Sequence, residues 1–187
     1  MIPSGNVVDN NIFAYSLNSP VIFFDPQGFK AVDITYRLMS LMRINALKFA
    51  AYIFTQIVLR GVYKGILNSF KYFYNNSKTK GAWDLKNQGW KLSSEDWYVF
   101  KGKKLRQDDP GNIHFGYVGA VMFPLGILRA GAGVYQIYSG TSKWSYRFTF
   151  FDDPRDSTMI VLGYSLFIYD ILKSVSKILR RAKLRFY

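Results

Sequence analysis

Two short polar segments of the chain carry residue types that could do acid–base chemistry. The first is Asp109-Pro110-Gly111-Asn112, which is followed by His114, and the second is Asp152-Asp153-Pro154-Arg155-Asp156. Proline and glycine in the first segment predict a turn whose glycine allows close backbone approach and which delivers Asn112 and His114. The adjacent carboxylates of the second segment could act as a general acid and base or as Mg²⁺ ligands, since like charges held close together raise one pKa.

The second segment also has the pattern of a helix start. Asp153 would be the N-cap, Pro154 would occupy the first helical position, and Asp156 would lie in the first turn, where a carboxylate interacts favourably with the helix dipole. Asp152 lies one residue outside the cap, so capping does not explain it. Asp153 and Asp156 therefore have two interpretations, as helix-capping residues or as catalytic ones, and the sequence leaves both open.

His114 is the single histidine of the chain. It is flanked by apolar residues, which is typical of a hydrogen-bonded structural histidine. In a catalytic role it would suit acid–base chemistry near neutral pH, as in metal-independent RNA cleavage with the 2′-OH as nucleophile. Lys86 and Arg129 would then stabilise phosphate charge, and Arg155 would help to bind the substrate. Gln136 lies at helical spacing from Arg129, which fits either a substrate contact or an ordinary polar helix position.

The composition limits the classes of partner and of chemistry. The chain has 187 residues, 49% of them hydrophobic, which is enough to bury a core, and its 25 Lys and Arg against 12 acidic residues give a net charge of +13. This charge favours a polyanionic partner, such as nucleic acid, anionic lipid or an acidic protein. The absence of cysteine excludes disulfides and cysteine-based zinc or thiol chemistry, and a single histidine excludes a His-rich metal site.

Helical units are predicted on both sides of these polar segments. Residues 30–75 have apolar residues at three- and four-residue spacing, which predicts one long or broken helix, or two, with Gly61 and Gly65 as weak points. A polar loop over residues 75–81 would end this unit. Residues 170–187 predict an amphipathic helix. Each unit is interpreted either as a helix docked on the core with a solvated basic face, or as an element that touches RNA or lipid.

Targeting and spanning segments are not expected. The N-terminus lacks the charged and apolar regions of a signal peptide. The uncharged run over residues 110–128 is rich in glycine and proline, and the apolar run over residues 49–59 is too short to span a bilayer. Peripheral membrane contact through the basic amphipathic ends stays open.

The first 29 residues predict an extended segment, because turn signals separate short apolar stretches. Asn11-Ile12-Phe13-Ala14-Tyr15, Asn18-Ser19-Pro20 and the run from Pro20 to Phe29 resemble the end of the core of Rhs/YD-repeat proteins, which a variable toxin domain follows. The resemblance implies a self-cleavage motif that includes Asp25, Pro26, Gly28 and Phe29. Asp25 would match the carboxylate of an aspartyl protease pair, and the cut would fall between Phe29 and Lys30.

A second resemblance begins at residue 81. Its motifs are Gly81-Ala82-Trp83-Asp84-Leu85-Lys86, Asp109-Pro110-Gly111-Asn112, Phe115-Gly116-Tyr117-Val118-Gly119, Ile127-Leu128-Arg129-Ala130-Gly131-Ala132-Gly133 and Asp152-Asp153-Pro154-Arg155-Asp156. In this order they resemble the bacterial polymorphic toxin type 44 domain. The resemblance implies an antibacterial toxin with a cognate immunity protein, which would be acidic if it covers a basic cleft.

These observations predict a mainly α fold, with a single compact helical toxin domain, irregular Gly-rich loops and a short extended Rhs-derived segment in front. The predicted units are residues 1–29, residues 30–80 as a helical N-terminal part, and residues 81–187 as the type 44-like domain with its basic C-terminal helix. The leading hypothesis is an Rhs-associated toxin of interbacterial competition that hydrolyses a polyanion, first of all RNA. Its catalytic candidates are Asp109, Asn112, His114, Asp152, Asp153 and Asp156.

Two alternatives stay open: a toxin that hydrolyses the glycan of peptidoglycan, and a non-enzymatic toxin that permeabilises membranes through residues 44–73 and 157–187. The expected partners are the immunity protein, a nucleic acid or peptidoglycan substrate and, in full-length relatives, the Rhs shell and the secretion machinery. A divalent metal such as Mg²⁺ is the candidate cofactor. The chain is expected to be secreted or delivered into target bacterial cells.

Overall fold

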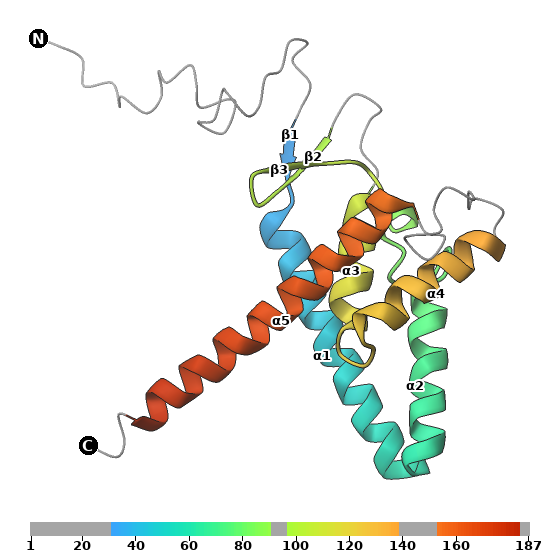
Figure 1. Ribbon diagram of the computed structural model, residues 1–187, viewed down its shortest axis with the longest axis vertical. Helices are drawn as coiled ribbons and strands as arrows, with labels where there is room; N and C mark the ends of the chain where they lie inside the picture. Colours follow the sequence, from blue (N-terminus) through green and yellow to red (C-terminus); the bar gives the residue numbers. More distant parts are fainter. Residues whose placement is uncertain (1–30, 91–96, 139–152, 184–187) are drawn as a thin grey trace, which may run out of the picture.

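Helices dominate the structure, as the sequence predicts. A computed structural model describes residues 31–90, 97–138 and 153–183. Its helices are α1 (Thr35–Arg60), α2 (Val62–Ser77), α3 (Asp109–Gly119), α4 (Leu125–Tyr138) and α5 (Pro154–Lys183), with a 3₁₀ turn at Leu85–Asn87 (Figure 1). The segment predicted to derive from an Rhs protein, with Asp25, Pro26, Gly28 and Phe29, lies outside the described residues.

The first two helices form a hairpin that breaks at one of the two glycines predicted as weak points. Gly61 has a φ of 79°, a conformation that favours glycine, and it ends α1. Gly65 lies inside α2 and brings the two helices together, because an added Cβ would lie 2.7 Å from the Cα of Ile57. Asn68 Nδ2 also donates to Gln56 Oε1 across the hairpin at 2.9 Å. The hairpin is therefore tightly closed near its tip, and the predicted polar loop starts only after Ser77.

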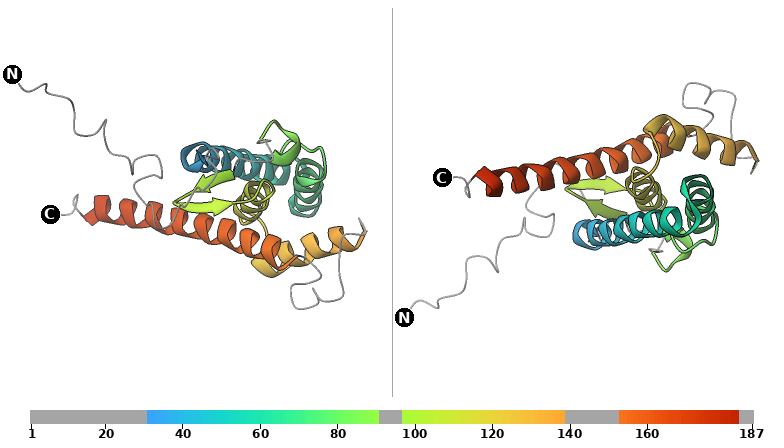
Figure 2. Two further views of the ribbon diagram at one scale, coloured as in Figure 1. Left: turned by 90° about the horizontal axis from the view of Figure 1, so that it is seen from above. Right: turned by 90° about the horizontal axis from the view of Figure 1, so that it is seen from below.

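Helix α3 lies between two layers, with α1 and α2 on one side and α4 and α5 on the other (Figure 2). Its crossing with α5 depends on glycines. An added Cβ at Gly116 would lie 2.1 Å from the carbonyl oxygen of Ile160, and one at Gly163 would lie 1.9 Å from that of Ile113. The expectation of a turn at residues 109–112 is wrong, because these residues form the first turn of α3. Proline is tolerated there because its missing N–H has no helical partner in any case.

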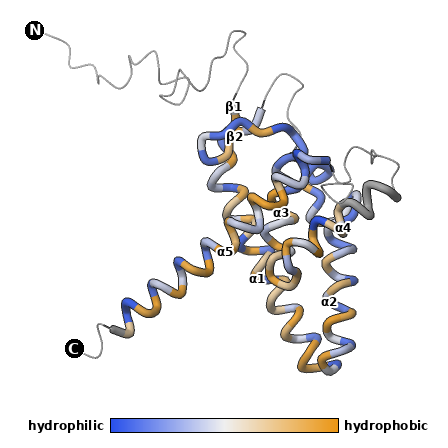
Figure 3. Tube along the Cα trace, viewed as in Figure 1, coloured by the Kyte–Doolittle hydropathy of each residue, from blue (hydrophilic) through white to orange (hydrophobic). Residues whose placement is uncertain are grey.

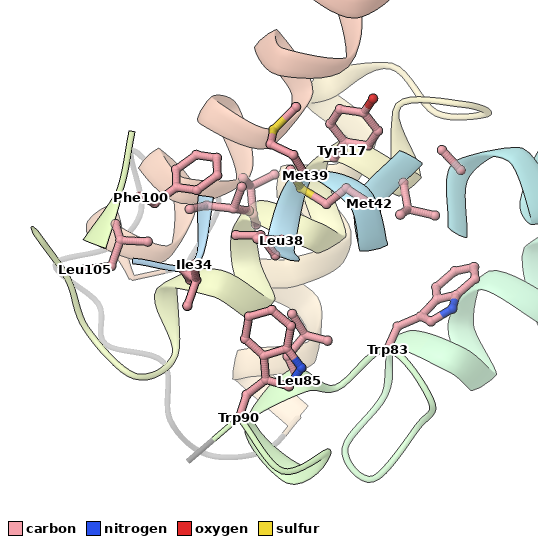
Figure 4. Close-up of a cluster of buried hydrophobic side chains, with 14 of the residues drawn as sticks. Ile34, Leu38, Met39, Met42, Trp83, Leu85, Trp90, Phe100, Leu105 and Tyr117 are labelled. Carbon is pink, nitrogen blue, oxygen red and sulfur yellow. The ribbon is translucent and has the colours of Figure 1, made fainter. Parts of the chain in front are cut away.

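The core fills the space between these layers and continues to the 3₁₀ turn and the sheet. Figure 4 shows side chains of α1, the loop after α2 and the sheet converging on one cluster. Its members include Leu38, Met42, Phe49, Trp83, Trp90, Phe100, Ile113, Val118 and Ile160. On the edge of the core, the Arg43 guanidinium donates to both carboxylate oxygens of Asp170 at 2.8 and 3.1 Å, and Tyr117 Oη donates to the same carboxylate at 2.8 Å. This cluster ties α1, α3 and α5 together.

A small sheet covers one end of the domain and was not predicted. Its strands are β1 (Ala31–Asp33), β2 (Trp97–Phe100) and β3 (Lys103–Leu105), in the order β1-β2-β3. β1 pairs with β2 in parallel, with Val32 opposite Tyr98, and β2 pairs with β3 antiparallel, with Tyr98 opposite Leu105. The run Trp97-Tyr98-Val99-Phe100 has the aromatic and β-branched composition that favours a strand.

Two helical segments leave the core. The second half of α1, the start of α2 and the part of α5 after Asp170 carry large exposed hydrophobic side chains. The interpretation of residues 170–187 as a helix docked on the core is therefore wrong for the described part. Residues Pro154–Ala182 of α5 are also long and apolar enough to cross a membrane by length and composition alone. The sequence analysis expected no spanning segment, although it kept residues 157–187 as a possible membrane-permeabilising element.

Candidate functional site

A cavity of about 500 Å³ lies where α2, the loop after it, α3, α4 and the start of α5 meet. Its walls include six aromatic side chains, those of Phe70, Phe73, Tyr74, Trp83, Phe115 and Phe123. Its polar residues are Ser77, Lys78, Thr79, Asp84, Lys86, Asp108, Asn112, His114 and Asp156. A concave, mostly apolar site with a few convergent polar groups is the usual form of a ligand site. Four of the predicted site residues, Lys86, Asn112, His114 and Asp156, therefore line one cavity.

The N-terminus of α5 forms as the sequence predicts. The backbone N–H of Arg155 donates to Asp153 Oδ1 at 2.8 Å, and the N–H of Ser157 donates to the Asp153 carbonyl at 2.9 Å. Asp153 therefore caps the helix, and Pro154 is its first residue. Asp156 lies in the first turn and lines the cavity. Asp152 lies outside the described residues.

Among the carboxyls of the described residues, that of Asp156 has the largest pKa shift. Burial, aided by the negative charges of Asp108, Asp153 and Asp109, raises its pKa from 3.8 to about 6, against a smaller opposing effect of Lys86. A carboxyl with this pKa exchanges a proton near neutral pH, as a general acid or base must. Burial together with neighbouring charges in a cleft is also the pattern of a functional group.

Asp108 is a site residue that the sequence analysis missed. It precedes α3, its carbonyl accepts the N–H of Gly111 at 3.0 Å, and it lines the cavity. A signal existed, because Asp108-Asp109-Pro110 repeats the Asp-Asp-Pro of residues 152–154 and both tripeptides begin a helix that borders the cavity. The cavity thus has a carboxylate from the start of α3 and another from the start of α5.

Asp109 and Arg155 do not line the cavity but join the two helices beside it. The carboxylate of Asp109 is fully buried, and it accepts from Arg155 Nε at 3.0 Å and from Arg155 Nη2. The backbone N–H of Arg106 donates to Asp109 Oδ2 at 2.6 Å. The hydrogen bond to Asp109 raises the pKa of Arg155. This partly buried, bidentate ion pair joins the starts of α3 and α5, which fixes where Asp108 and Asp156 lie.

His114 forms part of the cavity wall from inside the core. Its side chain is fully buried, Asn45 Nδ2 lies 2.9 Å from Nε2, and the ring makes an edge contact with Trp83. Burial lowers the pKa of His114 from 6.5 to about 4, so the ring is neutral at pH 7. With the Asn45 amide donating to Nε2, the ring proton is on Nδ1, which has no hydrogen-bond partner among the described residues.

The remaining predicted substrate contacts are not part of the cavity wall as described. Arg129 Nε donates to Ser157 Oγ at 2.8 Å, which joins α4 to α5. Gln136 belongs to α4, but its side chain lies outside the described part of the chain. Within residues 31–90, 97–138 and 153–183, no group of three or more His, Asp or Glu side chains is placed to hold a metal ion.

Comparison with known proteins gives one match. The sequence model of the family described as bacterial toxin 44 matches residues 72–169, which is more than half of the chain and includes every residue of the cavity wall except Phe70. No curated protein and no solved structure matches the chain.

Proposed function

The chain belongs to the bacterial toxin 44 family, and from this we propose that it is an antibacterial toxin that hydrolyses its target by acid–base catalysis in the aromatic cavity. The observation that carries the proposal is the raised pKa of Asp156, about 6, in a cavity that also contains Asp108. A general acid and a general base beside one substrate are the elements of acid–base hydrolysis.

The two carboxyls have different parts in the proposed reaction. Asp156 donates its proton to the leaving oxygen as the scissile bond breaks, and with a pKa of about 6 roughly a tenth of the molecules carry that proton at pH 7. Asp108 takes a proton from the attacking water. Asn112 and Lys86 line the same cavity and are placed to hydrogen-bond the substrate. His114, neutral at pH 7, shapes the wall and is not the acid.

The charges of the cavity wall favour a glycosidic bond over a phosphodiester. The wall carries Lys78 and Lys86 against Asp84, Asp108 and Asp156. Of the arginines predicted to contact the substrate, Arg155 is paired with Asp109 and Arg129 donates to Ser157. Aromatic side chains suit the faces of sugar rings, and two carboxyls in one cavity suit glycan hydrolysis. We therefore place the glycan of peptidoglycan first among substrates.

RNA is the second candidate, and it has its own supporting observation. The chain carries a net charge of +13, and the N-terminal turns of α3 and α5 both border the cavity. Helix N-termini favour anions, so a phosphate could be held there together with Lys78 and Lys86. In that case Asp156 would exchange the protons, in the role that the sequence analysis gave to His114.

Membership of the toxin family also supports a proposal about delivery into other bacteria and a proposal about a protein partner. We propose that the chain is delivered into competing bacteria behind an Rhs-type core, with residues 1–29 as the end of that core. We also propose that a cognate immunity protein protects the producing cell. An acidic immunity protein fits the charge of +13.

The test compares the activity of the purified 187-residue chain on peptidoglycan sacculi and on total RNA. Asp156→Asn keeps the size of the side chain but removes the titrating group, and Asp33→Asn is the matched control, because the exposed Asp33 accepts from the Thr35 N–H at 2.7 Å far from the cavity. We expect soluble glycan fragments from the wild type and the control, and a loss of at least about a hundredfold in Asp156→Asn.

Each contrary result has a distinct meaning. Cleavage of RNA with intact sacculi would replace the glycan by RNA as the substrate. Equal activity of Asp156→Asn and wild type would overturn the acid–base role of Asp156. Expression in host cells gives the same contrast, because a wall enzyme kills only after export and an RNA enzyme kills from the cytoplasm.

A further inference from the structure

We propose that the tip of the α1–α2 hairpin docks the protein on an anionic lipid bilayer. The tip is the end of α1, Gly61 and the start of α2, over residues 54–67, and it projects away from the core (Figure 1). This inference goes beyond the proposed hydrolysis and does not depend on it, because lipid vesicles contain neither glycan nor RNA.

The tip is an exposed apolar surface. Its large side chains are solvent-exposed, with exposed fractions of 70% for Phe54, 64% for Val58, 68% for Leu59, 64% for Val62 and 81% for Tyr63. Figure 3 shows hydrophobic residues continuing to the end of the hairpin. Contiguous apolar residues of this kind on a surface indicate a partner.

Charge identifies the partner as anionic. Arg60 and Lys64 lie within the tip, and the chain has no acidic residue from residue 34 to residue 83. Apolar side chains with Lys and Arg among them, and an exposed tyrosine, are typical of segments that sit at a membrane surface. An interface with another protein would be expected to contain ion pairs in both directions, with carboxylates on both surfaces. The tip has no carboxylate.

A second segment has the same composition and reaches the same side of the molecule. The part of α5 after Asp170 exposes Ile171, Leu172, Val175, Ile178 and Leu179, and its charged residues are basic. In Figure 1 both segments project downward from the core, α5 to the lower left and the hairpin tip to the lower right. The first part of α5 carries Asp156 and packs on α3, so only the part after Asp170 is free to touch a bilayer.

The family match supports a separate role for these two segments. It covers residues 72–169, so both the hairpin tip and the part of α5 after Asp170 lie outside it. The two helices are held together at the tip, because Gly65 packs on Ile57 and the Asn68 side chain donates a hydrogen bond to Gln56. A rigid apolar tip loses little conformational freedom on binding.

The test is co-sedimentation of the full chain with vesicles of phosphatidylcholine alone or mixed with phosphatidylglycerol. We expect binding to the anionic vesicles, weaker at high salt, and little to the neutral ones. Leu59→Glu/Val62→Glu is expected to weaken binding at least about tenfold, and Arg60→Gln/Lys64→Gln roughly fivefold per residue removed. Tyr36→Ser is the matched control, because Tyr36 is 86% exposed at the opposite end of α1.

Folding and alternative partners are checked in parallel. All four tip positions are exposed, so circular dichroism and the melting temperature should be unchanged, and Leu59→Ser/Val62→Ser repeats the test without adding charge. Anionic vesicles that fail to bind the wild type, or that bind both tip double variants as well as the wild type, would overturn the proposal. So would a dimer in light scattering that the tip variants split, because a second copy would then cover the tip.

Discussion

The surroundings of Asp156 favour its proposed function but lower the stability of the folded chain. Its carboxyl is held in the cavity near three other carboxylates, and burial raises its pKa to about 6. An ionised carboxylate in this setting destabilises the folded chain, whereas a protonated one does not. The carboxyl that is best suited to acid–base chemistry therefore lowers the stability of the folded chain when it is ionised.

The first prediction concerns the stability of Asp156→Asn. Because the pKa of Asp156 is raised from 3.8 to about 6 on folding, the stabilising effect of protonation is complete below about pH 4 and is lost as the pH rises through about 6. The variant should therefore melt at a higher temperature than the wild type near pH 7 and at the same temperature near pH 4. Thermal unfolding followed by circular dichroism at both pH values measures this.

The control for this prediction is again Asp33→Asn, whose side chain is exposed and can still cap the N–H of Thr35. Its melting temperature should follow the wild type at both pH values. An Asp156→Asn variant that melts below the wild type near pH 7 would show that the carboxylate stabilises the start of α5 more than its burial destabilises it.

At the scale of the helices, the crossing of α3 and α5 determines the site. The two helices start at Asp-Asp-Pro tripeptides, and the Asp109–Arg155 ion pair joins their first turns. Further along, Gly116 and Gly163 let each helix touch the backbone of the other. Close approach of this kind has no room for a methyl group, since well-packed interiors contain few voids.

The second prediction is that Gly163→Ala destabilises the protein by about 3 kcal/mol, because an added Cβ would lie 1.9 Å from the Ile113 carbonyl oxygen and the helices would have to separate. Gly131→Ala is the matched control within α4, where nothing lies within 4 Å of the added Cβ and alanine should stabilise the helix by about 0.5–1 kcal/mol. Urea unfolding of both variants gives the two values. A Gly163→Ala protein as stable as the wild type would mean that the α3–α5 crossing is looser than the structure shows.

The sequence predicted those elements whose signals are local. The cap at Asp153 and the break at Gly61 depend on neighbouring residues, and both are confirmed. The sheet was missed because β1 and β2 are separated by two helices and pair only in the folded chain. Residues 109–112 were predicted as a turn because proline and glycine are poor helix formers, yet packing against α5 outweighs that preference.

The sequence predicted several residues of the candidate site, but it did not predict the role of each one. Asp156, Asn112, His114 and Lys86 do meet at one cavity. Sequence could not show that Asp109 is neutralised by Arg155 while Asp108, its neighbour, faces the cavity, because that depends on how the first turn of α3 is rotated. Burial of His114 is likewise a property of the assembled layers, and it changes the expected protonation of the ring.

At the scale of the whole molecule, His114 connects the layers. It belongs to α3, its ring lies 2.9 Å from the amide of Asn45 on α1, and it contacts Trp83 in the loop after α2. The ring must therefore be neutral for the three parts to pack as they do. Protonation of one imidazole in this position acts on the stability of the entire domain.

The third prediction follows from the direction in which folding shifts the pKa of His114. The pKa of His114 falls from 6.5 to about 4 on folding, so its contribution to stability is complete above about pH 6.5 and is lost as the pH falls toward 4, by about 3 kcal/mol in total. Asp156 acts in the opposite direction over the same range, because its protonation removes an unfavourable charge. The wild type should therefore lose less stability with acid than Asp156→Asn, in which the effect of His114 is isolated.

Urea unfolding from about pH 7 to about pH 4 tests both parts of this argument. In Asp156→Asn the free energy of unfolding should fall by about 1 kcal/mol per pH unit below pH 6.5, and the wild type should show a shallower slope. Because the chain has a single histidine, its ring proton is one resolved NMR signal, which should not titrate in the folded protein above about pH 5. A His114 signal that titrates near pH 6.5 would show that the ring reaches solvent, and the proposed wall of the cavity would then have to open in solution.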